Sequence, residues 1–303
     1  MTEEPEAQDE APRGNPVARF FLVPLLVVLT AAGIFFLFSL LTFERRTPAD
    51  YLQEVRGGSA NRRWQAAFEL SRSIGNMPPG PERDKLAAEA LRVFQGLSGK
   101  RPDDVMVRRY LVLVLGKLKD PAAGPALLGS VADPDPETRL YAVWALGVLK
   151  PKEALSTVLE ASLSEDAGMR KMAAYVLGQL NDPAAVPRLK VLAEDRTADV
   201  RWNAAIALAE LHDGSGLPVL RSMIDRAALA GQAGLSSEQT ETAMVSALKA
   251  LAILKDAESL PAIEKVSRED PNLRVREAAQ RAAEATRGRT SLRLEGVEGL
   301  LVG

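Results

Sequence analysis

Apolar residues between Asp104 and Asp213 recur with the spacing of amphipathic helices. The same pattern occurs three times in full and a fourth time in part. The four segments are VRRYLVLVLGKLKDP, TRLYAVWALGVLKP, MRKMAAYVLGQLNDP and VRWNAAIALAELHDG. Each carries an arginine, and successive arginines are 31 residues apart, at Arg108, Arg139, Arg170 and Arg201. Within each segment the apolar positions follow the helical period of about 3.6 residues. A fixed period of this length predicts a solenoid whose repeat unit is a pair of short helices.

Polar residues at fixed offsets from the arginine predict where the helices begin. The residue four positions earlier is Asp104, Asp135, Asp166 or Thr197, and each has a side-chain oxygen that can cap a helix N-terminus. The second helix of a repeat is predicted to begin after Asp120-Pro121 and Asp182-Pro183, because proline has no N–H to leave unpaired at a helix start. Asp213 is the matching residue of the next repeat.

The repeated motif V-R-x-x-A-A-x-A-L-x-x-L-x-D-P resembles the short bacterial HEAT repeat of the phycobilisome-lyase-like variety. The resemblance covers residues 50 to 285 approximately. It implies an all-α, right-handed α-solenoid of helical hairpins. Repeats of this kind serve many unrelated tasks, so the resemblance predicts a fold and leaves the function open.

The array begins before the four regular segments. A short helix is expected from Pro48 to about Val55, and the first repeat is expected around Arg63. Its second helix is predicted from Glu82 to about Leu97, after a proline-rich loop.

The array also continues after the four regular segments. After Arg201 the register resumes at Met244, which replaces the arginine, and residues 230–234 are an insertion. Arg276 opens a last half-repeat capped by Asn272. We therefore expect about six and a half helical pairs within residues 47–285. Residues 286–303 are expected to form a C-terminal capping strand, a docked extension or a mobile tail.

The N-terminal region has a different character. Residues 1–19 are rich in acidic residues and proline without apolar periodicity, which predicts a disordered tail. Residues 20–43 contain no charge, and 24 helical residues at about 1.5 Å each exceed the roughly 30 Å of a bilayer core. A signal peptide would need a basic N-terminal region and a shorter apolar segment. We therefore predict a transmembrane helix rather than a signal peptide or a buried soluble helix.

Arginines near the predicted span bear on its orientation. The C-terminal side carries more of them than the N-terminal side: Arg45, Arg46, Arg56, Arg62 and Arg63 against Arg13 and Arg19. The positive-inside rule then predicts a solenoid on the cytoplasmic face of a bacterial inner membrane. The periplasmic face stays an alternative, because arginines inside a folded helix influence membrane orientation less than arginines in a loop.

Composition narrows the classes of function. The net charge is -2 with both signs interspersed, which gives no basic surface for nucleic acid. The absence of cysteine excludes disulfides and thiolate chemistry and decides no compartment. His212 is the single histidine, aligned with Lys119, Lys150 and Asn181 in a predicted turn.

Catalytic chemistry is not expected. The HEAT-repeat enzyme deoxyhypusine hydroxylase needs several His-Glu pairs to hold iron, and phycobilin lyases share the repeat type without any mark of a bilin pocket here. No phosphate-binding glycine loop and no nucleophile motif occurs. We expect no catalytic residue, no metal and no cofactor.

The arginine column is expected to tie each repeat to the next through turn carbonyls and carboxylates, the alternative being a charged ladder presented to a ligand. Second helices line the concave face in folds of this type, and their charges are of mixed sign. The candidate contacts are Lys152, Glu153, Arg188, Lys190, Arg221, Asp225, Glu264 and Lys265, with Glu160 and Glu194 on the same helices.

Such a surface suits a protein or peptide. The sequence therefore predicts a membrane-tethered scaffold that binds a protein partner. The alternatives are an assembly subunit of a membrane complex and a lyase-like enzyme.

Overall fold

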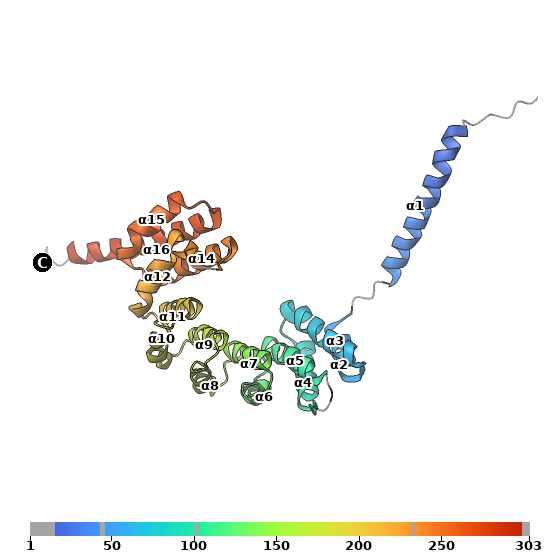
Figure 1. Ribbon diagram of the computed structural model, residues 1–303, viewed down its shortest axis with the longest axis horizontal. Coiled ribbons are helices and arrows are strands. Elements are labelled where there is room, and N and C mark those ends of the chain that lie inside the picture. Colours follow the sequence, from blue (N-terminus) through green and yellow to red (C-terminus); the bar gives the residue numbers. More distant parts are fainter. Residues whose placement is uncertain (1–15, 43–45, 100, 102, 232–233, 299–303) are drawn as a thin grey trace, which may run out of the picture. The chain divides into compact units, whose positions relative to one another are not determined.

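The computed structural model describes residues 16–42, 46–99, 101, 103–231 and 234–298 (Figure 1). Throughout these residues the regular secondary structure is helical and includes no strand, which confirms the all-α class. The chain divides into two compact units, residues 1–47 and residues 48–303.

The first unit contains one long helix, α1 (Pro16–Thr42). It begins four residues before the predicted boundary at Phe20, with Pro16 at a position where a missing N–H costs nothing. Its segment Phe20–Phe38 is long and apolar enough to cross a membrane, and its side chains are exposed. Phe43, the last residue of the predicted span, and the tail up to residue 15 lie outside the described residues.

The second unit is a stack of helical pairs preceded by α2 (Pro48–Gly57). Its first helices are α3 (Ala60–Ser73), α5 (Asp104–Leu118), α7 (Pro136–Leu149), α9 (Ala167–Leu180), α11 (Ala198–Glu210), α14 (Ser237–Leu254) and α16 (Leu273–Glu298). Its second helices are α4 (Pro81–Gln95), α6 (Gly124–Ser130), α8 (Ala154–Ala161), α10 (Val186–Leu192), α12 (Leu217–Met223) and α15 (Leu260–Glu269). This agrees with the expected six and a half pairs in the described part of the chain.

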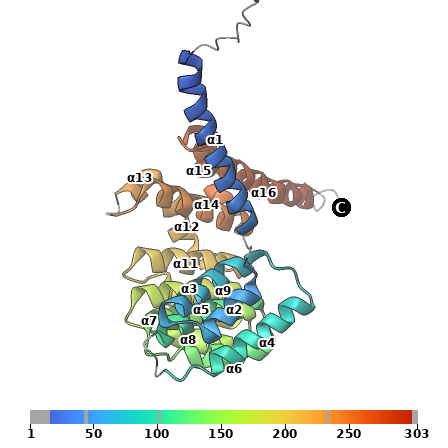
Figure 2. The ribbon, with the colours of Figure 1, turned by 90° about the vertical axis from the view of Figure 1, so that its right-hand side faces the viewer.

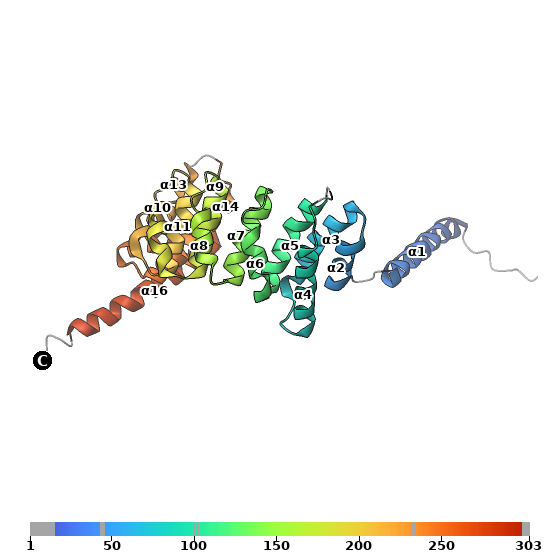
Figure 3. The same ribbon diagram turned by 90° about the horizontal axis from the view of Figure 1, so that it is seen from below.

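Consecutive first helices pack against one another, and each second helix packs on a first helix. Figures 1 and 2 both place α4, α6 and α8 on one side of the first helices, and Figure 3 shows the pairs following in chain order from α3 to α11. The core is built of leucine, alanine and valine, with Leu115, Leu146, Leu177 and Leu208 fully buried. The apolar positions of the sequence repeat are therefore the contacts between repeats.

Most predicted caps are present. Asp135 and Asp166 cap α7 and α9 by accepting the amide N–H of Thr138 and Met169 at 2.9 and 2.7 Å. Thr197 occupies the N-cap position of α11 without a side-chain cap bond. The aspartates before the second helices cap short 3-10 turns, Pro121–Ala123, Pro183–Ala185 and Gly214–Gly216, which lead directly into α6, α10 and α12. Each accepts an N–H two residues on within 2.9 Å: Asp120, Asp182 and Asp213.

The expectation for Asp104 was wrong. Asp103 is the N-cap residue of α5, and Asp104 is the first helical residue. The carboxylate of Asp104 instead accepts a hydrogen bond from Arg63 at 3.1 Å, and both side chains are buried. Arg63 also bonds to Asp103, which occupies the N-cap position without a side-chain cap bond, so both carboxylates at this helix start are joined to the preceding repeat.

Each of five first helices ends on a residue with positive φ. These residues are Lys119, Lys150, Asn181, His212 and Lys255, with φ between 51° and 58°. A left-handed residue at this position ends a helix and turns the chain toward the next one. The interpretation of His212 as a turn residue is confirmed.

The C-terminal part of the array departs in detail from the prediction. A further short helix, α13 (Arg226–Ala230), follows α12 and ends at Ala230, where the predicted insertion begins. Helix α16 continues to Glu298, so its backbone passes the predicted end at residue 285, and the alternative of a capping strand is wrong for the described residues.

The arginine column forms bonds both within a repeat and between repeats. Arg170 donates through Nε and Nη2 to both carboxylate oxygens of Asp195 in the next repeat, at 2.7 and 3.0 Å. Its Nη1 donates to the carbonyl oxygens of Ser164 and Glu165 in the turn that precedes its own helix. Arg170 therefore ties its repeat to the next as expected, whereas Arg139 and Arg201 bond to carbonyl oxygens of the turn before their own helix.

The same arrangement occurs at two further turns. Asp133 accepts from Arg108 through its carboxylate, and its carbonyl oxygen accepts from Arg139 at 2.9 Å. Asp270 accepts in the same way from Arg226 and Arg276. Each aspartate therefore joins one arginine of the preceding repeat to one arginine of its own.

These contacts change the titration of the aspartates. The hydrogen bonds from Arg170 lower the pKa of Asp195 from 3.8 to about 2, against the opposing effect of burial. For Asp135, burial raises the pKa, but hydrogen bonds from Arg109 and Thr138 outweigh it and bring the pKa to about 2. Because the folded-state pKa lies below the ordinary value, this stabilisation is complete above about pH 4 and is lost as the pH falls toward 2.

Three glycines mark the closest approach of first helices. Gly116, Gly147 and Gly178 occupy one repeat position. A Cβ on Gly116 would lie 2.7 Å from the Cβ and 3.0 Å from the Cα of Ala145 in the next first helix. The space between α5 and α7 therefore excludes any side chain at this position.

We predict that Gly116→Ala lowers the unfolding midpoint although alanine favours helix by about 1 kcal/mol over glycine. Overpacking of this kind costs about 1–3 kcal/mol. The control is Gly129→Ala in α6, where a new Cβ meets nothing within 4 Å and the midpoint should not fall. Thermal melts followed by circular dichroism measure both, and equal midpoints for the two variants would contradict the close approach.

We further predict that Asp195→Asn destabilises the protein at pH 7 by about 2 kcal/mol, the equivalent of the lowered pKa, and flattens the loss of stability between pH 4 and pH 2. The control is Asp199→Asn, whose ion pair with Lys171 is half exposed and should contribute less than about 1 kcal/mol. Urea denaturation at pH 7 and pH 3 tests this, and the same change in both variants would rule out a special role for Asp195.

Candidate protein-binding surface

Five of the eight predicted contact residues already form hydrogen bonds or ion pairs inside the solenoid through their side chains. Arg188 donates to the hydroxyl and carbonyl oxygens of Ser162, both at 2.7 Å. Lys190 pairs with Asp213 at 3.0 Å, and Glu264 accepts from Arg287 at 2.5 Å. These side chains connect one repeat to its neighbour, and a role for them in binding a partner stays a prediction.

Arg221 is the fourth bonded residue. It donates to Asp256 at 2.8 and 3.0 Å and to the Ser259 hydroxyl at 3.2 Å, and it pairs with Glu258 at 2.8 Å. The hydrogen bonds that Arg221 donates to Asp256 raise the pKa of Arg221, so its side chain stays charged at physiological pH.

The remaining candidates are exposed. Lys152 and Glu153 stand at the start of α8, and Lys265 lies on α15. None of the three side chains pairs with an opposite charge among the residues that the structure describes. Asp225 is exposed as well, but its carboxylate caps α13 by accepting from Ala227 and Ala228. Lys152, Glu153 and Lys265 are therefore the charges that the fold leaves available.

Second helices are separated by grooves. One groove of about 420 Å³ lies between α6 and α8, lined by Leu128, Val131, Thr157, Glu160 and Ala161 with Arg139 of α7. Another of about 470 Å³ lies between α12 and α15 and is lined in part by Arg221, Asp225 and Lys265. Three of the predicted residues are thus brought together at this second groove.

The two grooves are built on the same plan. Both are lined by the residue in the arginine column, which is Arg139 in the first and Met244 in the second. Each lining contains both apolar and charged side chains, among them Leu128 and Glu160 in the first groove and Val266 and Lys265 in the second. The sequence analysis missed the grooves, because they depend on the spacing between helices rather than on residue type.

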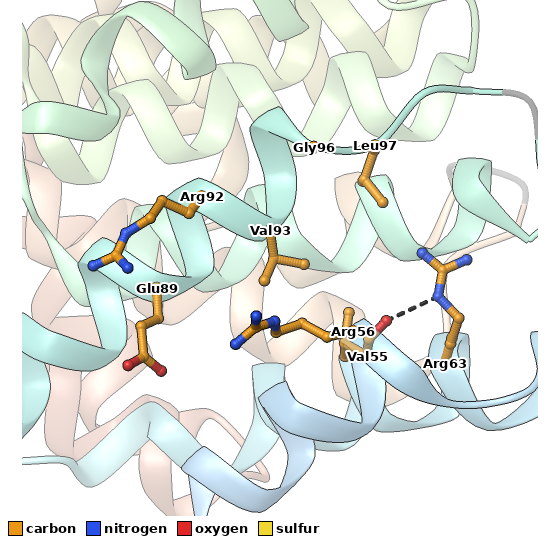
Figure 4. A pocket seen from close by; sticks show the side chains of 8 residues that line it. All are labelled: Val55, Arg56, Arg63, Glu89, Arg92, Val93, Gly96 and Leu97. Carbon is orange, nitrogen blue, oxygen red and sulfur yellow. Dashed lines mark hydrogen bonds between the residues drawn. The ribbon is translucent and has the colours of Figure 1, made fainter.

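A further pocket lies at the start of the solenoid, between α2 and α4 (Figure 4). Its volume is about 280 Å³, and three arginines line it: Arg56, Arg63 and Arg92. The sequence analysis assigned no binding role to these arginines.

No described group of three or more His, Cys, Asp or Glu side chains is arranged to hold a metal ion. His212 is exposed at the end of α11 and lines none of the three pockets described above.

Comparisons with known proteins agree with this architecture. Residues 92–171, 129–209 and 158–236 match a sequence profile of HEAT repeats. No curated protein matches the sequence.

Several solved structures share the arrangement of helices. The complex of CpcE and CpcF of phycocyanin lyase from Nostoc sp. PCC7120 is 17% identical, with a TM-score of 0.52, over 81% of this chain and 96% of that chain. The Escherichia coli protein YibA is 16% identical, with a TM-score of 0.48, over 77% and 81%. A designed armadillo repeat protein is 18% identical, with a TM-score of 0.41, over 80% and 100%.

At this identity the likeness to the lyase complex concerns the fold alone, because one fold hosts many activities. The repeat profile, the stacked helical pairs and the shared fold lead to the same assignment. The chain is a HEAT-repeat protein with the architecture of a repeat scaffold.

Proposed function

We propose that this chain is a membrane-tethered scaffold that binds a protein partner through the face formed by its second helices. The observation that carries the proposal is the pair of grooves between second helices, each lined by both apolar and charged side chains. Protein interfaces combine an apolar centre with polar groups around it. The expectation that this face is the concave one stays a prediction.

Helix α1 supports the membrane tether. Its exposed apolar side chains include Phe20, Leu26, Ile34 and Phe36. Burying a large apolar side chain is favourable by about 1.5–3 kcal/mol, so a whole helix of them is stable in a bilayer and unfavourable in water.

The charge pattern supports a protein rather than a nucleic acid. The exposed residues Lys152 and Glu153 are adjacent and of opposite sign, and Lys265 stands near Glu269 in the second groove. A polyanion would need an unbroken basic surface. A partner with charges of both signs and apolar anchors matches this face better.

We place the solenoid on the cytoplasmic side of a bacterial inner membrane. The arginines after α1 outnumber those before it, and this excess sets orientation. We predict that a fluorescent-protein fusion at Gly303 is bright and a phosphatase fusion at the same residue is inactive. The reverse result would place the solenoid in the periplasm.

The partner proposal is tested with charge reversal at residues that the fold does not use. We predict that the full chain carrying Lys152→Glu and Lys265→Glu loses a partner that cross-links to the wild type. The matched control is Lys249→Glu with Arg274→Glu, an equal change of charge at exposed positions of first helices. Arg188, Lys190 and Arg221 are unsuitable, because changing them breaks bonds between repeats.

Other outcomes separate the alternatives. Capture of the same partner by residues 1–46 alone would favour an assembly subunit whose membrane helix makes the main contact. Equal loss in the two double variants would contradict a specific role for the second-helix face. A metal or bilin that purifies stoichiometrically with the wild type would favour a lyase-like enzyme instead.

A further inference from the structure

The pocket between α2 and α4 combines an apolar floor with an unusual set of charges. Val55, Val93 and Leu97 contribute the apolar side chains. Figure 4 shows the charged groups of Arg56, Glu89 and Arg92 on one side of the pocket and Arg63 on the other.

Arg63 belongs to the structure of the fold. Its side chain is buried, its Nε donates to the carbonyl oxygen of Val55 at 2.8 Å, and its Nη1 bonds to Asp103 and Asp104. Two carboxylates therefore balance its charge. Arg63 therefore lines the pocket, but its guanidinium is already bonded within the protein.

Arg56 and Arg92 differ from Arg63 in this respect. Both side chains are exposed, and neither guanidinium pairs with a carboxylate among the described residues. Glu89 is the single acidic residue lining the pocket. Arg56, Glu89 and Arg92 together carry a formal charge of +1, a sign that attracts an anion.

The chain itself ties this pocket to the end of α1. Helix α2 begins at Pro48, six residues after Thr42, and six residues span at most about 22 Å. Arg56 is in the last turn of α2. Arg56 thus follows the last residue of α1 by 14 positions in the sequence, and anionic headgroups attract basic residues close to a membrane helix.

We propose that the pocket formed by Arg56, Glu89 and Arg92 binds the phosphodiester of an anionic phospholipid. The proposal rests on the membrane tether proposed above. The guanidinium groups of Arg56 and Arg92 donate paired hydrogen bonds to phosphate oxygens, a geometry that lysine cannot provide. Glu89 disfavours a doubly charged phosphate, so a phosphodiester such as that of phosphatidylglycerol is preferred over inorganic phosphate.

The test uses the full chain in a non-ionic detergent, titrated with phosphatidylglycerol or phosphatidylcholine and followed by native mass spectrometry. We expect the wild type to prefer phosphatidylglycerol. The double variant Arg56→Gln with Arg92→Gln should bind phosphatidylglycerol with an apparent affinity about tenfold lower, because it loses the charge-assisted hydrogen bonds to the phosphate. The matched control is Arg268→Gln with Arg281→Gln, the same loss of charge at exposed helical sites, which should bind as the wild type does.

Unchanged binding by the Arg56/Arg92 variant would overturn the proposal, as would equal binding of the two lipids by the wild type. Inorganic phosphate as a competitor distinguishes the two sources of the ligand, and full competition at equal concentration would assign the pocket to free phosphate. Arg56→Lys with Arg92→Lys keeps the charge and should bind at an intermediate level. Thermal melts are expected to be unchanged, because both arginines are exposed and unpaired.

Alkaline extraction of membranes keeps this test separate from the proposed function. Release of the wild type from membranes would refute the tether itself. Retention of both the wild type and the Arg56/Arg92 variant, with equal lipid binding, would refute the lipid pocket alone.

Discussion

Close packing of consecutive first helices is the constraint on which the rest of the solenoid depends. The helices α5, α7 and α9 bury apolar side chains against their neighbours, and glycine at one repeat position lets adjacent backbones approach. A repeat of this kind has no core of its own, because its apolar face is completed by the next repeat. The bonds between arginine and aspartate act at the turns that lead into these helices, where they fix one repeat against another.

Much of the fold followed from the sequence, because periodicity records burial. Leu115 and Leu146 align at the repeat spacing and are fully buried, and the aspartates that precede the second helices cap the short 3-10 turns that lead into them. Asp104 was assigned wrongly because its partner, Arg63, lies in the longer first repeat and outside the regular spacing. The extent of α16 was also missed, since its last turns lack the apolar pattern on which the prediction relied.

The candidate surface was harder to read, because a charged residue looks the same in a sequence whether it binds a neighbour or faces solvent. Arg188 has its guanidinium bound to Ser162, 26 residues earlier, and no local signal marks such a contact. Lys152 and Lys265 are charged like Arg188, but no oppositely charged side chain among the described residues pairs with them. A useful signal was nevertheless present at a fixed offset: Asp133 and Asp195 each stand 25 residues after a column arginine.

That offset is not filled in every repeat, and the difference bears on recognition. The residue 25 positions after Arg139 is Ser164, so no carboxylate of the next repeat holds its guanidinium, and Arg139 lines the groove between α6 and α8. In the groove between α12 and α15 the same position is Met244, which is buried and apolar. Met244 has no exposed surface for a partner to contact, whereas Arg139 is partly exposed. At this repeat position the groove between α6 and α8 therefore offers a partner a hydrogen-bond donor, and the groove between α12 and α15 does not.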